Sequence, residues 1–446
     1  MTDLGLTMDN ALTRIPADFD GFQAFVNQHD YPVFIFGADI VGKILAELLK
    51  SHGIHIEAFI DNNKNKCNVN LNNVPVKHAS VLADENRNAV VLIASTYIAD
   101  IIAQLEELGF MNWLPIYNIL EDKKETDLEG FLVGDLRFNH SGGEFTHDFD
   151  TFVLSNMITS QKKYLDPEKL YIRSVDLVIT EKCSLKCKDC SNLMQFYEKP
   201  IDISAEELCQ NLDDLCAVAD EINEIRIIGG DPFMNKDCHN VVKHAASYKQ
   251  VNKVVVYTNG TICPPEEKIA QMANDKTFVF ITTYGKLSRN AEKLGAILEK
   301  YNIPFNKQPA YGWTDCGDIK EYDRNEEELK QVFQFCCAKH FTTLTDGKLF
   351  RCPFAANSYR LQSMPNAKEN YISITGAASE SVEDLQQRKQ QLYHYLRDIP
   401  SIPACNSCNG RTYGDPEIEP GIQTKKPIEY KKYDQVIELK EEPYTI

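Results

Sequence analysis

The apolar positions along the chain fall into two kinds of run. Short, nearly continuous apolar stretches are typical of buried parallel strands, and apolar residues three and four apart are typical of helices that cover a sheet. Residues 31–36, 55–60 and 89–94 are stretches of the first kind, and residues 43–51 have the helical spacing, with Gly53 as the stop. We therefore expect a small α/β domain with a parallel sheet over residues 1–122.

A second series of strands and helices begins near residue 171. One helix opens with the capping box Ser204–Glu207, in which a serine and a glutamate three residues later accept hydrogen bonds from backbone N–H groups of the first turn. Repeated β-then-α units of this length favour a full or partial parallel barrel over residues 171–330, with its site at the C-terminal ends of the strands. The expected strands are 175–179, 224–228, 253–257, 278–282 and 303–306.

The remaining segments have weaker patterns. Residues 123–170 are polar and aromatic without a clear period, which indicates a connector. Residues 341–352 predict a β-hairpin that turns at Asp346-Gly347, a pair favoured in type I′ turns. We assign residues 331–412 to a small hairpin-and-helix domain, and we expect residues 413–446 to run extended over the surface.

Composition and charge narrow the class of protein. The 446 residues are 43% apolar and 25% charged, which is ordinary for a globular protein of two or three domains. A net charge of −18 argues against a nucleic-acid partner, because phosphate binding needs a basic face. No apolar run reaches the length of a membrane span, and the start lacks a signal-peptide pattern. We expect a cytoplasmic protein, in which clustered cysteines indicate metal binding rather than disulfides.

Three cysteines are the most informative feature of the sequence. Cys183, Cys187 and Cys190 have the spacing C-x3-C-x2-C and directly follow an expected strand. Three thiolates so close together can hold three irons of a cubic iron–sulfur cluster, which leaves the fourth iron open to a ligand from outside the protein. Zinc is the alternative, although three ligands without a fourth nearby suit it less well.

The motif resembles that of the radical S-adenosylmethionine (SAM) superfamily, and motifs after the next strands support the resemblance. Residues 229–232 are similar to the element whose backbone holds the amino group of SAM, and Thr258–Thr261 is also common in the family. Asp189 departs from the family, which usually has an aromatic residue there. The resemblance implies SAM contacts from Gly229, Gly230, Asp231, Pro232, Asn259 and Thr282.

The resemblance also implies a fold, two cofactors and a reaction. It implies a partial (β/α)6 barrel of the TIM type, in which a [4Fe–4S] cluster on the three cysteines binds S-adenosyl-L-methionine through its open iron. One electron, from a donor such as flavodoxin or ferredoxin, would cleave SAM and release a 5′-deoxyadenosyl radical. That radical would take a hydrogen atom from an unactivated C–H bond. No general base is assigned.

A second cysteine set follows in the C-terminal region. Cys337 and Cys352 form the pattern C-x9-G-x4-C about Gly347, and Cys405-Asn-Ser-Cys408 follows. These four resemble the twitch domain of radical SAM dehydrogenases, a shortened relative of the SPASM domain, and imply an auxiliary [4Fe–4S] cluster. That cluster would accept an electron from the substrate, relay electrons or hold the domain together. Zinc on the same cysteines is an alternative ligand, and Cys336 is an alternative to Cys337.

Cys316 belongs to neither set. It is an additional ligand, a candidate catalytic thiol that returns a hydrogen atom to the substrate radical, as in radical SAM epimerases, or a loop cysteine without a role.

The N-terminal residues 36–62, followed by Asn73-Val-Pro-Val76, resemble small Rossmann-like domains attached to sugar acyltransferases and other glycan-modifying enzymes. The resemblance implies nucleotide-sugar binding or a structural or docking use. Asp39 stands where the dinucleotide pattern has glycine, so its carboxylate would repel a diphosphate, whereas Asp61 is suited to bond a ribose. Our first hypothesis is therefore an oxidoreductase that acts on a small sugar-like or nucleotide-linked metabolite. A radical SAM maturase of ribosomal peptides and a non-catalytic zinc or iron–sulfur scaffold are the alternatives.

Overall fold

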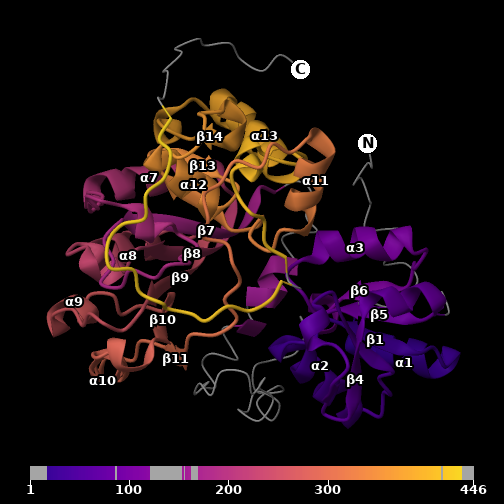
Figure 1. Ribbon diagram of the computed structural model, residues 1–446. Helices are drawn as coiled ribbons and strands as arrows, with labels where there is room; N and C mark the ends of the chain where they lie inside the picture. Colours follow the sequence, from indigo (N-terminus) through magenta and orange to yellow (C-terminus); the bar gives the residue numbers. More distant parts are fainter. Residues whose placement is uncertain are drawn as a thin grey trace. The chain divides into compact units, whose positions relative to one another are not determined.

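The computed structural model describes residues 18–85, 88–120, 153–154, 156–161, 169–412 and 415–433. Contacts group the chain into two compact units (Figure 1). The first comprises residues 1–171 with 278–283 and 295–309, and the second comprises residues 172–277, 284–294 and 310–446. Most of the expected connector lies outside the described residues. The domain boundaries expected from the sequence remain predictions.

The first unit contains a six-stranded sheet in the order β3-β4-β2-β1-β5-β6. Its pairs are parallel except for the antiparallel pair β3-β4. The three predicted strands and the predicted helix are present, whereas β3, β4, β6, α1, α3 and α4 were not predicted. The elements are α1 Phe19–His29, β1 Val33–Phe36, α2 Ile40–Ser51, β2 Ala58–Asp61, β3 Asn70–Leu71, β4 Val74–His78, β5 Val90–Ile93, α3 Ile98–Glu107, β6 Trp113–Pro115 and α4 Tyr117–Leu120.

Strand β1 shows why this sheet needs a cover on both faces. Val33 and Ile35 pack into one apolar cluster, and Phe34 and Phe36 pack into another. Successive side chains of a strand point to opposite faces, so a strand that is apolar at every position is buried on both. The predicted α/β class with a parallel sheet is confirmed here.

A second sheet has eight strands in the order β11-β10-β9-β8-β7-β12-β13-β14. Strands β7 to β11 are neighbours in chain order, as the predicted partial barrel requires, and β8-β9 and β10-β11 are parallel. The strands are β7 Tyr171–Thr180, β8 Glu221–Gly229, β9 Val251–Thr258, β10 Thr277–Thr283, β11 Phe305–Pro309, β12 Thr342–Thr345, β13 Lys348–Phe350 and β14 Tyr371–Ser373.

The predicted hairpin continues this sheet. Strand β12 pairs parallel with β7 and antiparallel with β13. Asp346 and Gly347 have φ values of +52° and +65°, and a type I′ turn needs a positive φ at both central positions. The hairpin that follows the barrel region is therefore joined edge to edge with the strand that precedes the first cysteine motif.

Helices connect the strands of the second sheet. Ser204 caps α7 by accepting from the Glu207 backbone N–H at 3.2 Å, and the expected apolar face Leu208, Leu212 and Leu215 is fully buried. No helix within the described ranges is long and apolar enough to cross a membrane. The helices are α7 Ala205–Val218, α8 Cys238–Ala246, α9 Glu266–Ala270, α10 Ala291–Lys300, α11 Glu326–Phe335, α12 Pro353–Leu361 and α13 Val382–Arg397.

Candidate metal and cofactor site

The predicted three thiols lie on residues 181–193, which we call the cysteine loop and which directly follow β7. Burial raises the pKa of Cys183, and Asp231 and the thiols of Cys190 and Cys187 raise it further. Burial raises the pKa of Cys190 to about 11, although backbone N–H groups of residues 192–194 lower it in part. The thiols are therefore close enough to interact, and none ionises easily alone.

This donor set fits a bound cluster. A buried thiolate beside other thiols is costly unless a cation offsets its charge, and metal coordination deprotonates a thiol outright. Among the described residues, no group of three or more His, Cys, Asp or Glu side chains is arranged to hold a single metal ion. In a cubic cluster each thiolate binds a different iron, so its ligands stand further apart than the ligands of one ion.

Two glycines let the end of β8 lie against the cysteine loop. The Gly230 N–H donates to the Thr180 carbonyl at 2.8 Å. A Cβ on Gly230 would lie 2.0 Å from the Lys182 carbonyl oxygen, and one on Gly229 would lie 2.2 Å from that of Thr180. Close approach of backbone to backbone therefore requires both glycines, apart from any approach to a ligand.

Asp231 joins the ends of β8 and β9. Its carboxylate is 1% exposed and has both oxygens in use. One oxygen accepts from the Phe233 N–H at 3.0 Å, and the other accepts from the Thr258 hydroxyl at 2.9 Å and the Asn259 N–H at 3.0 Å. Asp231 thus holds the loop, and its expected contact with SAM stays a prediction. Pro232 opens a buried 3₁₀ turn over Pro232–Met234.

The Thr258–Thr261 motif contacts the cysteine loop. The Asn259 side-chain N–H lies 3.6 Å from Cys183 Sγ and 3.2 Å from Ser184 Oγ. The hydroxyls of Ser184 and Thr261 are also hydrogen bonded to each other. The motifs after β7, β8 and β9 therefore meet at one place. Thr282 lies in β10, opposite Gln308 of β11, in residues grouped with the first unit, and its role stays a prediction.

Comparison with known families decides the class of this domain. Residues 177–282, from the end of β7 to β10, match the family model of the radical SAM superfamily. The chain carries a radical SAM domain. Residues 29–113 match the model described as C2185-like, N-terminal.

Similar curated proteins include several GTP 3′,8-cyclases. That of Clostridium acetobutylicum is 24% identical over 290 residues, which are 58% of this chain and 85% of that protein. That of Lactiplantibacillus plantarum is 28% identical over 88 residues, 19% of this chain and 26% of that protein. That of Aliarcobacter butzleri is 24% identical over 183 residues, 38% of this chain and 54% of that protein. The last two matches span about half of those proteins or less.

Similar solved structures are more distant. BtrN in complex with AdoMet and 2-DOIA has a TM-score of 0.33 and 14% identity, with 54% of this chain and 93% of that chain covered. Native anSMEcpe with bound AdoMet and Cp18Cys peptide has a TM-score of 0.25 and 17% identity, with coverages of 31% and 42%. Both scores lie below 0.5, and neither structure informs the substrate of this chain.

The second cysteine set lies beyond the radical SAM domain, and the structure brings Cys336 toward its other members. Burial is the main cause of the raised pKa of Cys352, Cys405 and Cys408, and in each case the Cys336 thiol raises the pKa further. Burial raises the pKa of Cys337 to about 11, and the other thiols that act on it are those of Cys336 and Cys316. Three of the four predicted auxiliary cysteines therefore gather with Cys336, the neighbour of the predicted Cys337.

Backbone donors point at two of these sulfurs. Cys352 caps α12 and its Sγ accepts from the Ala355 N–H at 3.5 Å, and Cys408 Sγ accepts from the Gly410 N–H at 3.4 Å. Such donors favour the thiolate form that binds metal. The two sets share one apolar cluster around Phe196 and Phe354, which Cys183, Cys190, Cys352 and Cys408 all contact.

Cys316 lies on a loop that touches both cysteine sets. The Arg411 guanidinium donates to its Sγ at 3.5 Å. A Cβ on the next residue, Gly317, would lie 2.9 Å from the backbone carbon of Asp189 in the cysteine loop. Ile319, two residues further on, forms a β-bridge with Cys408. The loop therefore packs against the cysteine loop on one side and the second cysteine set on the other.

In the N-terminal unit, the carboxylates of Asp39 and Asp61 stabilise the turn after β1. Asp39 caps α2 and its carboxylate lies 3.0 Å from Lys66 Nζ. Asp61 accepts from the Ala38 N–H at 3.1 Å and from the Asn63 N–H at 2.8 Å. A helix cap thus explains aspartate at the place where the dinucleotide pattern has glycine, and Asp61 is engaged by backbone rather than held ready for a ribose.

Two glutamines that contact the cysteine loop were not predicted from the sequence. Gln195 donates to the Cys190 carbonyl at 3.3 Å and to the Gly317 carbonyl at 3.0 Å. Gln423 donates to Cys187 Sγ at 3.3 Å. No motif singles out either residue, because Gly317 and Gln423 are more than a hundred residues from their partners in the chain.

Proposed function

We propose that this chain is a radical SAM iron–sulfur oxidoreductase that acts on a small sugar-like or nucleotide-linked metabolite. The observation that carries the proposal is the meeting of three interacting thiols with the Gly229-Gly230 and Asn259 segments at the ends of β7, β8 and β9. This arrangement lies within the residues that match the superfamily.

The chain's own residues hold and orient the cofactors in this proposal. Cys183, Cys187 and Cys190 hold a [4Fe–4S] cluster, which with bound SAM supplies a 5′-deoxyadenosyl radical. The backbone of residues 229 and 230 receives the amino group of SAM, with Asp231 holding that backbone in place. Leu185, Cys187 and Leu193 of the loop are buried, which limits the access of water to a reactive radical site.

We propose a second [4Fe–4S] cluster on Cys336, Cys352, Cys405 and Cys408, with Cys336 in the place first given to Cys337. The Cys336 thiol raises the pKa of each of the other three, which supports this ligand set. Such a cluster has no open iron, so it suits the acceptance of an electron from the substrate radical, and the net reaction is a two-electron oxidation. Flavodoxin or ferredoxin in the cytoplasm is the proposed electron donor.

Two observations support the substrate class. The similar GTP 3′,8-cyclases carry a nucleotide in their name. The N-terminal unit has the parallel sheet of a Rossmann-like domain, which is a frequent carrier of nucleotide and sugar recognition. A peptide substrate would instead assign the chain to the maturases.

The test is release of 5′-deoxyadenosine by anaerobically reconstituted, reduced protein. Nucleotide sugars and aminocyclitols form one panel of substrates, and short peptides form the other. We expect a compound of the first panel to stimulate release and to be oxidised. Stimulation by peptides alone contradicts the proposed substrate class, and return of an epimer without oxidation favours Cys316 as a hydrogen donor.

A triple variant tests the cysteine loop. Replacing Cys183, Cys187 and Cys190 together with Ala should abolish SAM cleavage and leave about four irons per chain on the second set. A matched variant that replaces Cys209, Cys216 and Cys263 should keep both properties. SAM cleavage that persists in the first variant rules out the assignment.

Two adjacent serine variants test the second set. We expect Cys336→Ser to lose about four irons per chain, and Cys337→Ser to retain them. The two residues share a peptide bond, so each variant is a control for the other. The reverse result restores Cys337 as the ligand.

A further inference from the structure

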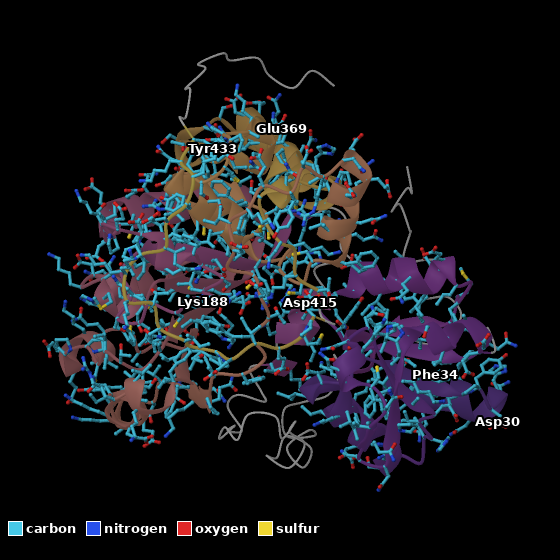
Figure 2. The ribbon with its side chains drawn as sticks, viewed as in Figure 1. Asp30, Phe34, Lys188, Glu369, Asp415 and Tyr433 are labelled. Atoms are coloured by element: carbon cyan, nitrogen blue, oxygen red, sulfur yellow. The ribbon has the colours of Figure 1, made fainter. Side chains whose placement is uncertain are left out.

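The C-terminal residues 417–430, which we call the C-terminal segment, run beside the cysteine loop. Figure 1 draws them as an extended yellow trace, and Figure 2 labels Lys188 in the cysteine loop. The Lys188 N–H donates to the Ile422 carbonyl at 2.7 Å, and the Thr424 N–H donates to the Lys186 carbonyl at 2.7 Å. These bonds flank Cys187, which forms an antiparallel bridge with Gln423.

The Gln423 side chain faces the central cysteine of the motif. Its Oε1 accepts from the Lys186 N–H at 2.7 Å, and its Nε2 donates to Cys187 Sγ at 3.3 Å and to the Gly421 carbonyl at 2.7 Å. Because both ends of the amide are bonded, its orientation is determined: the N–H end faces sulfur. A backbone amide or glutamine N–H toward a thiolate is a charge-assisted hydrogen bond.

Both ends of the C-terminal segment are anchored. The Ile418 N–H donates to the Trp313 carbonyl at 2.7 Å, and the Ile428 N–H donates to the Gln195 carbonyl at 3.0 Å. Tyr430 stacks edge to face on Phe196, with ring centroids 5.6 Å apart. The segment is thus attached at both of its ends and in the middle, beside Cys187, so its position does not depend on one contact.

Gly421 allows the close approach in the middle of the segment. It has a φ of +77°, and a Cβ there would lie 2.5 Å from the ring of Tyr284. Burial raises the pKa of Tyr284, and the thiols of Cys187, Cys190 and Cys183 raise it further because this ring lies close to the motif. Glycine is therefore required where the segment crosses a ring beside the cysteines.

We propose that the C-terminal segment is the outer wall of the radical SAM cysteine site, and that Gln423 is a positioning residue for the Cys187 thiolate. The inference rests on the proposed function, since it assigns Cys187 to a cluster. Hydrogen bonds to the sulfur ligands of an iron–sulfur cluster raise its reduction potential by stabilising the more negative reduced state, and exclusion of water protects it. Gln423 therefore eases reduction of the cluster.

The first test needs no cluster. The metal-free, reduced protein is treated with iodoacetamide, and the rate of alkylation is followed at Cys187 and at Cys263 by peptide mass spectrometry. We expect a chain that ends at residue 416, in which Cys187 loses its cover, to be alkylated several-fold faster at Cys187 and equally fast at Cys263. An unchanged rate at Cys187 in the shortened chain overturns the wall, whether or not the protein cleaves SAM.

The second test addresses Gln423 alone. Gln423→Met keeps the length of the side chain and removes the donor, and Lys425→Ala is the control in the same segment. The Cys405→Ser/Cys408→Ser background leaves one cluster to be titrated by electron paramagnetic resonance. We expect a lower reduction potential in Gln423→Met, at full iron content, and no change in the control. Equal potentials contradict the role of Gln423, while SAM cleavage by the wild-type protein would still support the proposed function.

Discussion

Single residues at this site act mainly through backbone geometry. Gly230 has an ordinary φ, so no conformational preference of the backbone explains it, yet no other side chain fits beside the Lys182 carbonyl. Gln423 and Asp231 hold backbone groups around the cysteines and present few unused polar atoms. The chemistry at this place therefore depends on residues that shape the loop as much as on the three thiols.

Replacement of Gly230 tests this packing. Gly230→Ala should destabilise the second unit by about 1–3 kcal/mol through overpacking and reduce iron incorporation at the cysteine loop. Urea unfolding and iron analysis measure the two effects. Gly285→Ala is the matched control, because its Cβ would meet nothing within 4 Å and only its positive φ of +56° carries a cost. Full iron content in Gly230→Ala contradicts the expected clash.

The buried Lys43 side chain should make the stability of the protein depend on pH. It is 3% exposed in α2, and burial lowers its pKa to about 8, with Asp39 opposing and Lys66 adding to the shift. The unfolded chain holds this proton more strongly, so stability gains as pH rises from about 8 toward the ordinary value of 10.5. Lys43→Met should abolish that gain in thermal unfolding midpoints measured between these pH values. If the unfolding midpoints of the two proteins change with pH in parallel, this prediction is wrong.

At the scale of elements, a buried ion network ties the hairpin and α12 to the start of the cysteine loop. Arg360 of α12 donates to Glu181 at 2.7 Å and to Asp346 of the hairpin turn at 2.6 Å. The Arg360 and Glu181 side chains are 8% and 7% exposed. Burial of this kind makes the pair costly to break, because each charge alone is left without a partner.

A double-mutant cycle measures this connection. Arg360→Met alone should cost about 3–5 kcal/mol of unfolding free energy, since it leaves the Glu181 carboxylate buried and unpaired. Glu181→Gln combined with Arg360→Met should cost less than the sum of the single changes. Guanidinium unfolding of the four proteins gives the coupling. Strict additivity would show that the two side chains act independently.

At the scale of the whole molecule, the chain builds two separate sheets. The six-stranded sheet uses residues 33–115 alone, and Gln161 completes it by donating to the Ile93 carbonyl at 2.7 Å and accepting from the Tyr117 N–H at 3.2 Å. Its two apolar clusters use only residues between 19 and 158. The N-terminal sheet and its helices therefore have an apolar core of their own.

The N-terminal fragment should therefore fold alone. We expect residues 1–165 to show cooperative thermal unfolding by circular dichroism and protection of β1 and β5 in hydrogen exchange. A fragment that ends at residue 150 lacks Gln161 and should melt at a lower temperature, because the Ile93 carbonyl and the Tyr117 N–H each lose a hydrogen bond to the Gln161 side chain. A fragment of 165 residues without cooperative unfolding contradicts this prediction.

Much of the fold was predictable because its signals are local. Apolar runs marked β1, β5, β7 and β9, since a strand buried on both faces needs apolar residues in succession. The Asp346-Gly347 pair marked the hairpin, because its positive φ values suit few other residues. The motif C-x3-C-x2-C marked the radical SAM cysteines, because one loop carries all three. The short strands β4 and β6 escaped prediction, since their apolar runs are too brief to stand out.

What the sequence by itself determined is therefore the class of each sheet, the hairpin and the family of the cysteine motif. Only the tertiary structure favours Cys336 over Cys337 in our proposal, because adjacent residues have nearly the same spacing to every other cysteine, whereas the Cys336 thiol raises the pKa of Cys352, Cys405 and Cys408. It also brought Gln423 to Cys187 across 236 residues. Spacing along a chain constrains near neighbours, whereas a partner so remote is set by the packing of the folded chain.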